Sequence, residues 1–189
     1  MPTSGDATVN GFSITKETKR VKAAIGVSPQ ETAVAPGLSV KENLRLICGV
    51  HGFSKGKTEE KIKELTERFG LSEVILRKAG KLSGGWQRRV SIAMALISEP
   101  KILFLDEPTL GLDVIARQEL WSIIRSLKGG VTIILTTHYM EEAEALSDRI
   151  GIMSRGKLLT VGTVEELKKQ AGASDLEGAF VKIVKEDRI

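Results

Sequence analysis

The sequence predicts an α/β protein with a mostly parallel sheet and a helical insertion across residues 36–98. The apolar runs at residues 101–105 and 131–136 are typical of strands buried on both faces, as in parallel sheets. An amphipathic helix pattern at residues 114–127 lies between these two runs. Residues 36–98 instead carry three helix patterns in succession. Buried strands with an intervening helix therefore define the class, and the helical stretch is inserted into it.

Length and composition fit one globular domain. The chain has 189 residues, of which 41% are hydrophobic and only 4% aromatic, so the core must be aliphatic. The net charge of +4 arises from acids and bases that interleave, which argues against a nucleic-acid partner. The single cysteine, Cys48, excludes an internal disulfide framework and suits a reducing compartment. No apolar run is long enough to cross a bilayer, and we expect no signal peptide. Together these features predict a cytoplasmic protein.

The N-terminal part predicts two short strands, at residues 7–14 and 23–27, interrupted by Gly11 and by a charged turn at residues 16–20. Residues 33–38 are predicted to form an apolar loop.

Three helices follow within the insertion. Ser39 with Glu42 forms a capping box that opens the first helix. The second covers residues 58–69 with Gly70 just past its end, and the third covers residues 84–97. Cys48 is expected to be a buried residue of the first helix.

The C-terminal part predicts alternating short elements. The pattern predicts a helix, a hairpin around Ser154-Arg155-Gly156, a capped helix and a last helix. Their residue ranges are 141–146 for the first helix, 150–153 and 157–161 for the hairpin strands, 164–170 for the helix capped by Thr163 and Glu166, and 176–184 for the last. Trp121, in the preceding helix at residues 114–127, is expected to lie in the protein core.

Two adjacent acids, Asp106 and Glu107, end the first buried strand. Open α/β sheets bind ligands outside the carboxyl ends of their strands, and successive side chains diverge there. Asp106 could hold Mg²⁺, while Glu107 could orient and deprotonate a water for attack on a phosphoryl group. The alternative is a strand end with two solvated acids, and this dipeptide alone does not decide between them.

Three further features carry possible chemistry. Ser83 followed by Gly84 and Gly85 opens a helix whose free N–H groups could bind an anion, although an ordinary N-cap is the alternative. His138 follows the second buried strand and could donate to a phosphate oxygen, or could be a structural histidine. Gln30 lies in a loop where its amide could reach a metal or a water.

In this order along essentially the whole chain, these features resemble the nucleotide-binding subunit of ABC transporters. Residues 27–30 resemble the Q-loop, 82–85 the family signature, 101–108 the Walker B strand, 111–113 the D-loop and 137–138 the switch histidine. The amino-acid sequences of three further segments resemble those of the ATPases of bacterial and archaeal ABC-2-type exporters. These segments are residues 136–150, 162–167 and 176–180.

The resemblance implies a P-loop NTPase-type fold, mostly parallel, with an N-terminal antiparallel part and a helical signature subdomain. It implies one domain over residues 1–189. The catalytic core would comprise residues 1–35 and 99–172, the signature subdomain residues 36–98, and a helical tail residues 173–189.

The family mechanism sandwiches ATP between two ATPase subunits, which would form a homo- or heterodimer. Ser83, Gly84 and Gly85 would then bind the γ-phosphate in trans. The remaining roles implied by the resemblance are Mg²⁺ placement by Asp106 and Gln30, activation of water by Glu107, stabilisation of the γ-phosphate by His138, and communication across the dimer by Asp113.

The resemblance also implies a second kind of partner. The helical insertion, with the loop after Gln30 that contains Pro36-Gly37-Leu38-Ser39, would contact a separate membrane-spanning permease subunit. The protein would then lie peripherally on the cytoplasmic face of the membrane.

Two departures from the family pattern are visible. Trp86 stands where the family commonly has glutamine, and Gln87 follows it. More seriously, the chain contains no G-x-x-x-x-G-K-[S/T] P-loop. The nearest segment, residues 52–58, has three residues between its glycines and is expected to be an interhelical loop.

We therefore expect a truncated ABC ATPase that binds ATP weakly or not at all, and whose strands at 102–105 and 131–135 lose packing neighbours. The alternative is a degenerate subunit that lends its signature in trans to a complete partner. A soluble ABC ATPase acting on nucleic acid or ribosomes is disfavoured by the even charge pattern and by the lack of a long coiled-coil insertion.

Overall fold

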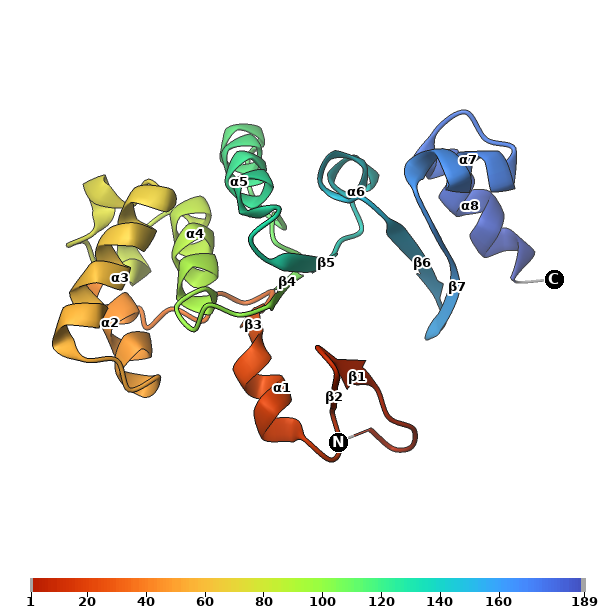
Figure 1. Cartoon of the computed structure of the whole chain (residues 1–189). Helices are drawn as coiled ribbons and strands as arrows, with labels where there is room; N and C mark the ends of the chain where they lie inside the picture. The colour runs from red at the N-terminus through yellow and green to blue at the C-terminus, as the bar shows by residue number, and fades with distance from the viewer. Residues whose placement is uncertain (1, 188–189) are drawn as a thin grey trace. The chain divides into compact units, whose positions relative to one another are not determined.

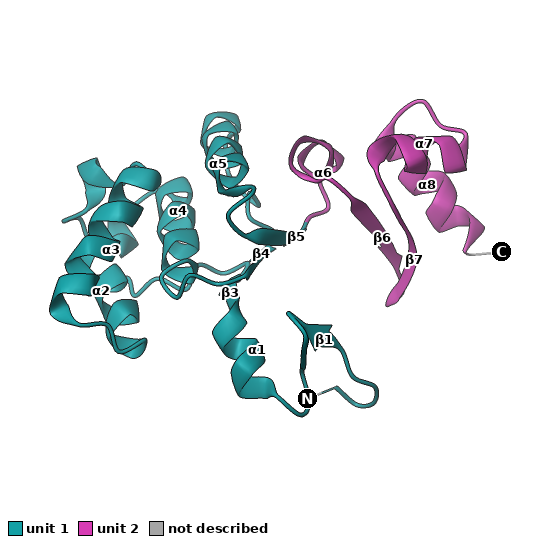
Figure 2. Ribbon diagram, viewed as in Figure 1, with its two compact units in different colours: residues 1–136 teal, residues 137–189 magenta. Residues whose placement is uncertain are grey.

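The described part of the chain, residues 2–187 of a computed structural model, divides into two compact units, residues 1–136 and 137–189 (Figure 2). Each unit is described by itself below. None of the helices in residues 2–187 is long and apolar enough to span a bilayer.

Three parallel strands form the sheet of the first unit (Figure 1). They are β3 (Ile25–Ser28), β4 (Ile102–Asp106) and β5 (Thr132–Thr136), in the order β3-β4-β5. The strand register places Ser28 beside Leu105 and Asp106 beside Thr136, so the carboxyl ends of all three strands meet at one edge. The predicted α/β class with a parallel sheet is confirmed.

The two faces of this sheet differ in burial. On one face Gly26, Leu103 and Leu105 are buried, and this face packs against α4 (Gly84–Ala95). On the other face Val27 is 53% exposed and Ile134 46% exposed.

The predicted burial of residues 131–136 is therefore wrong. Within the described residues β5 pairs only with β4, which makes it an edge strand, and its side chains alternate between half-buried and exposed.

The N-terminal segment departs from the prediction in two places. The predicted strand at residues 7–14 is a tight hairpin, β1 (Thr8–Val9) with β2 (Phe12–Ser13), which turns at Asn10-Gly11 with φ values of 49° and 81°. The predicted charged turn at residues 16–20 is wrong, because Thr18–Ala24 form helix α1. Val21 and Ala24 are buried on one face of α1 while its charged side chains stay exposed.

The inserted stretch is helical, as predicted. It contains α2 (Val40–Val50), α3 (Lys55–Arg68), the short 3-10 turns η1 (Ser72–Val74) and η2 (Ala79–Lys81), and α4. The Ser39–Glu42 capping box is present at the start of α2, and Cys48 is buried. In the P-loop-like segment only residues 52–54 form the connection, since Ser54 caps α3 and the rest of the segment is its first turn. The segment follows a helix, as expected.

Helix α5 (Val114–Leu127) completes the first unit and contacts α4. It has the predicted bounds, and its buried face includes Leu120 and Trp121. The predicted core position of Trp121 is confirmed.

The second unit follows the predicted element order. It contains α6 (Met140–Leu146), the hairpin β6 (Ile150–Ser154) and β7 (Lys157–Gly162), α7 (Val164–Ala171) and α8 (Leu176–Glu186). The hairpin turns at Arg155 and Gly156, with φ values of 49° and 77°. Its own core gathers Ile152, Leu167 and Ile183. Residues 188 and 189 of the predicted tail lie outside the described residues.

Candidate functional site

The carboxyl edge of the three-stranded sheet brings several predicted site residues together. Asp106 is the last residue of β4 and lies beside Thr136, the last residue of β5. Gln30 follows the end of β3 by two residues and is exposed. This edge is where ligands bind in open α/β sheets. Asp106, Glu107 and Gln30 therefore belong to one region of the first unit.

Asp106 is exposed and accepts a hydrogen bond from the Thr136 hydroxyl, with 2.5 Å between Asp106 Oδ1 and Thr136 Oγ1. The same hydroxyl accepts from the Glu107 backbone N–H at 3.2 Å, and the Thr136 carbonyl accepts from that N–H at 3.1 Å. Thr136 thus fixes both acids. The sequence prediction missed it, although a hydroxyl that ends the neighbouring strand was the available signal.

Glu107 has a left-handed backbone conformation with φ 45°. A non-glycine residue in this region costs free energy and occurs where the surroundings impose the conformation, often at functional sites. Here the Thr136 contacts hold the backbone of Glu107 on one side, and the Leu110 N–H donates to its carbonyl at 3.2 Å on the other. The two adjacent acids therefore differ in backbone conformation, since Glu107 but not Asp106 has a positive φ.

The signature segment opens α4. Ser83 occupies the N-cap position with φ −64° and ψ 160°, but its side chain makes no capping hydrogen bond. Ser83 and Gly84 are exposed, and the first N–H groups of a helix have no intrahelical partner. The hydroxyl and the positive end of α4 are therefore presented together, as an anion site requires.

The two glycines of this segment allow close packing against the start of α5. A Cβ added at Gly85 would lie 3.0 Å from Ala116 Cβ, and one at Gly84 would lie 3.6 Å from Leu112 Cδ2. Asp113 caps α5, since its Oδ1 accepts from the Ala116 N–H at 2.9 Å. The predicted signature and D-loop residues therefore lie next to each other, and Asp113 has a structural role that the sequence prediction did not include.

His138 belongs to the second unit, two residues after the end of β5. It is exposed, and its ring lies 4.2 Å from the ring of Tyr139 between centroids. The predicted carboxylates belong to the first unit, so the role of His138 stays a prediction.

Helix α4 also carries residues that the sequence prediction missed. Arg88 is only 5% exposed and donates to two carbonyl oxygens of the loop after β3, to that of Pro29 at 2.6 Å and to that of Gln30 at 2.5 Å. Ser91 shares a buried hydrogen bond of 3.0 Å with Ser28 at the end of β3. Trp86, the departure from the family pattern, is half-buried, and the Arg89 guanidinium carbon lies 4.6 Å from its ring centroid.

The oxygen ligands at the sheet edge suit Mg²⁺. Within residues 2–187 no group of three or more His, Cys, Asp or Glu side chains forms a metal cluster. Mg²⁺ in nucleotide sites is held by one or two carboxylates together with substrate phosphates, so it needs no such cluster. An exposed carboxylate oriented by a neighbouring hydroxyl, as in Asp106, fits this donor set.

Comparison with known proteins agrees with this geometry. The model of the ABC transporter family matches residues 1–110. A solved structure titled "Structure of ATP binding subunit of ABC transporter" superposes with a TM-score of 0.81 at 26% identity, over 96% of this chain and 77% of that one.

Curated relatives carry matching names. Among them are the doxorubicin resistance ATP-binding protein DrrA of Mycobacterium tuberculosis (40% identity over 98% of this chain and 55% of DrrA) and the linearmycin resistance ATP-binding protein LnrL of Bacillus subtilis (39% over 92% and 56%). A third is the probable multidrug ABC transporter ATP-binding protein YbhF of Escherichia coli (38% over 97% and 33%). The chain thus spans between a third and just over half of the length of these relatives. The family match and the agreement of fold show that the chain belongs to the ABC transporter family.

Proposed function

We propose that the chain is part of an ATP-hydrolysing subunit that couples ATP hydrolysis to export through a separate membrane subunit. The observation that carries this proposal is the pair of acids at the end of β4, Asp106 held by Thr136 and Glu107 in a left-handed turn. The drug-resistance names of DrrA and LnrL support the exporter branch.

The proposed chemistry is supported by the chemical types of these side chains and by the resemblance of their segments to the family motifs. Glu107 acts as general base toward a water that attacks the γ-phosphorus of ATP. Asp106 and the Gln30 amide would hold Mg²⁺, which would offset the charge of the phosphates. His138 donates a hydrogen bond to a γ-phosphate oxygen. Ser83, Gly84 and Gly85 bind the γ-phosphate of a nucleotide held by the other subunit.

We propose that the second ATPase subunit, identical or different, docks beside the signature segment. Val114 and Ile115, the first residues of α5, are 63% and 73% exposed. They directly follow Asp113, and Leu112 on its other side lies against the Gly84 position. Exposed apolar side chains next to an anion site suit an interface that closes over a nucleotide. Asp113 would then lie at the interface, where its proposed role is communication across the dimer.

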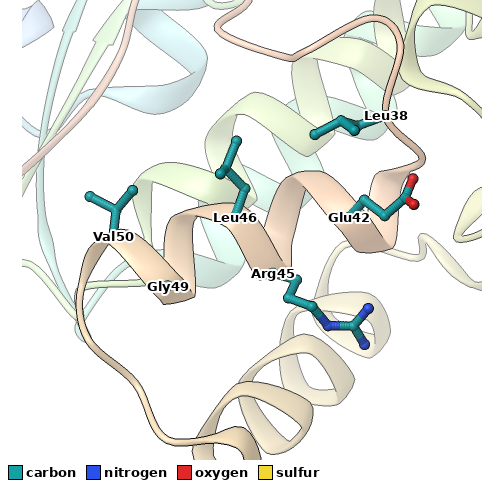
Figure 3. A pocket seen from close by; sticks show the side chains of 6 residues that line it. All are labelled: Leu38, Glu42, Arg45, Leu46, Gly49 and Val50. Carbon is teal, nitrogen blue, oxygen red and sulfur yellow. The ribbon is translucent and has the colours of Figure 1, made fainter.

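The membrane subunit is proposed to contact the helical insertion, with the protein on the cytoplasmic face of the membrane. Figure 3 shows a shallow pocket on the outer side of α2, lined by apolar Leu38, Leu46 and Val50 and by charged Glu42 and Arg45. Leu46 is 49% and Val50 74% exposed. A pocket lined by both apolar and charged side chains suits an amphipathic segment of a partner. In this proposal residues 36–98 form a subdomain that contacts the membrane subunit through α2 and the nucleotide through Ser83, Gly84 and Gly85.

The 189 residues alone are proposed to bind ATP weakly or not at all. They contain no G-x-x-x-x-G-K-[S/T] sequence, whose backbone cradle, lysine and hydroxyl supply most of the ground-state contacts to the phosphates. A non-catalytic subunit that only lends its signature is the second candidate, and it is favoured by the same missing motif. The strained Glu107 turn favours the catalytic subunit, because a non-catalytic one gains nothing from that strain.

The proposed role of the signature residues Ser83, Gly84 and Gly85 is tested by mixing this chain with a complete ABC ATPase subunit whose own signature serine is mutated to arginine; the role of Glu107 requires a chain that carries a P-loop and is tested separately. We expect no tight Mg-ATP binding by the isolated chain and ATP hydrolysis in the mixture. Ser83→Arg in this chain should abolish that hydrolysis, whereas Ser122→Arg, on the exposed side of α5, should preserve it. Tight binding by the isolated chain, or equal activity of the two variants, contradicts the proposal.

A further inference from the structure

The loop that follows β3, here called the β3 loop (residues 29–39), lies against residues 77–88, the stretch that contains the signature segment. The two are far apart in sequence, and the Arg88 contact to the loop spans 58 residues. Their contacts occur at the beginning, middle and end of the β3 loop. This arrangement joins the loop that carries Gln30 to the segment that carries Ser83.

At the beginning of the loop, Arg88 donates to two successive carbonyl oxygens, those of Pro29 and Gln30, at 2.6 and 2.5 Å. A planar guanidinium presents its donors in a fixed geometry, so this pairing sets the direction of the backbone as well as its distance. Arg88 is buried, whereas the Gln30 residue is exposed. The contact therefore fixes the backbone of Gln30 and leaves its amide available.

In the middle of the loop, the Thr32 hydroxyl donates to Gln87 Oε1 at 3.3 Å. The Gln87 Nε2 group donates to the Leu82 carbonyl at 3.1 Å, directly before Ser83. Gln87 therefore bridges the β3 loop and the approach to the signature serine.

At the end of the loop the contacts are made by the backbone. The Gly80 N–H donates to the Pro36 carbonyl at 3.1 Å, and the Ala79 N–H donates to the Leu38 carbonyl at 2.8 Å. Gly80 permits this approach, because a Cβ there would lie 2.8 Å from Pro36 Cβ.

Helix α2 holds the opposite side of the loop. Asn43 is fully buried; its Oδ1 accepts from the Ala35 N–H at 2.8 Å and its Nδ2 donates to the Ser39 carbonyl at 2.9 Å. The second half of the loop is thus held from two sides.

We propose that Arg88 is a positioning residue that holds the β3 loop, and with it Gln30, against the signature helix, so that the loop and the signature segment move as one body. The roles of Gln30 and Ser83 in this inference rest on the proposed function, but the mechanical linkage does not. Separating the two segments would break both hydrogen bonds from the buried Arg88 guanidinium to the carbonyl oxygens of Pro29 and Gln30, which is costly. A partner that displaces residues 36–39 would therefore displace Ser83 and Gln30 together.

Hydrogen–deuterium exchange of the whole 189-residue chain, without nucleotide, tests this linkage. In Arg88→Met we expect amide exchange in residues 29–39 and 79–87 to rise together by about tenfold, with α5 and the second unit unchanged. Arg88→Lys retains a charged donor and should give exchange between that of wild type and that of Arg88→Met. Arg45→Met, which removes an exposed arginine on α2, is the matched control and should leave both segments unchanged.

Three results would overturn the inference: a rise confined to one of the two segments, a uniform rise over the whole chain, or equal exchange in Arg88→Lys and Arg88→Met. If Arg88→Met does not fold, Gly80→Ala separates the segments at the other end of the loop and should also raise exchange in both. Unchanged exchange at residues 29–32 in Gly80→Ala contradicts movement as one body. Because the exchange experiment contains no nucleotide, its result does not depend on whether the ATPase experiments succeed. A negative exchange result likewise leaves the ATPase experiments valid.

Discussion

Gly26→Ala is expected to destabilise the first unit strongly, because the backbone of β3 at Gly26 lies close to the end of α4. A Cβ built at this position would lie 2.3 Å from the carbonyl oxygen of Ala95 and 3.0 Å from Pro100 Cγ. The Ala95 oxygen is a backbone atom and the Pro100 ring is bonded to the backbone at both ends, so neither can move aside easily. We therefore expect β3 to shift by roughly 1 Å away from the helix. That shift also stretches the buried Ser28–Ser91 hydrogen bond.

The cost is the overpacking penalty plus part of a hydrogen bond, together about 3 kcal/mol. For a domain of this size that corresponds to a fall in Tm of roughly 6–12 °C. Both tryptophans, Trp86 and Trp121, lie in the first unit, so thermal unfolding followed by tryptophan fluorescence reports on this unit. Gly56→Ala in the first turn of α3, where nothing lies within 4 Å of the new Cβ, is the matched control and should keep or slightly raise Tm. Equal Tm values for the two variants would refute the packing argument.

The remaining predictions concern the site and two local contacts. Thr136→Val, which removes the hydroxyl between Asp106 and the Glu107 N–H, should lower stability by about 1 kcal/mol in urea unfolding and reduce ATP hydrolysis by a fusion in which a P-loop segment precedes this chain; unchanged hydrolysis by that fusion contradicts the role of Thr136. The hydrogen bond from Lys61 lowers the pKa of Glu99, so this contact stabilises the fold above the ordinary carboxyl pKa and is lost as pH falls through the lowered value. The acid-unfolding midpoint should therefore move to higher pH in Glu99→Gln, and an unmoved midpoint argues against the contact. Ser39→Ala removes the α2 cap and should cost about 1 kcal/mol in urea unfolding, whereas a cost near zero would mean that the cap contributes nothing.

Features encoded within a few residues could be predicted from the sequence. The capping boxes of α2 and α7 and the turn of the β6–β7 hairpin each depend on residues no more than three positions apart. The apolar runs of β4 and β5 likewise located both strands correctly. The motif order along the chain, rather than any single residue, identified the family.

Features that depend on distant neighbours could not be predicted in this way. Helix α1 was missed because its charged side chains conceal a buried pair, Val21 and Ala24. The exposure of β5 depends on which strands flank it, which its own apolar sequence does not encode. Arg88 appears as one more basic residue in a helix, and only the carbonyl groups of a loop 58 residues earlier explain its burial.

The central claim is that Glu107 is the general base of an ATPase site at the end of β4. The most direct measurement joins a strand and G-x-x-x-x-G-K-[S/T] segment, taken from an ABC ATPase that contains one, to the N-terminus of this chain and compares ATP hydrolysis by the fusion with that by its Glu107→Gln variant. We expect the fusion to hydrolyse Mg-ATP, and Glu107→Gln to bind Mg-ATP as tightly while kcat falls by roughly 10²–10⁴-fold. Equal kcat values in the two proteins would contradict the claim.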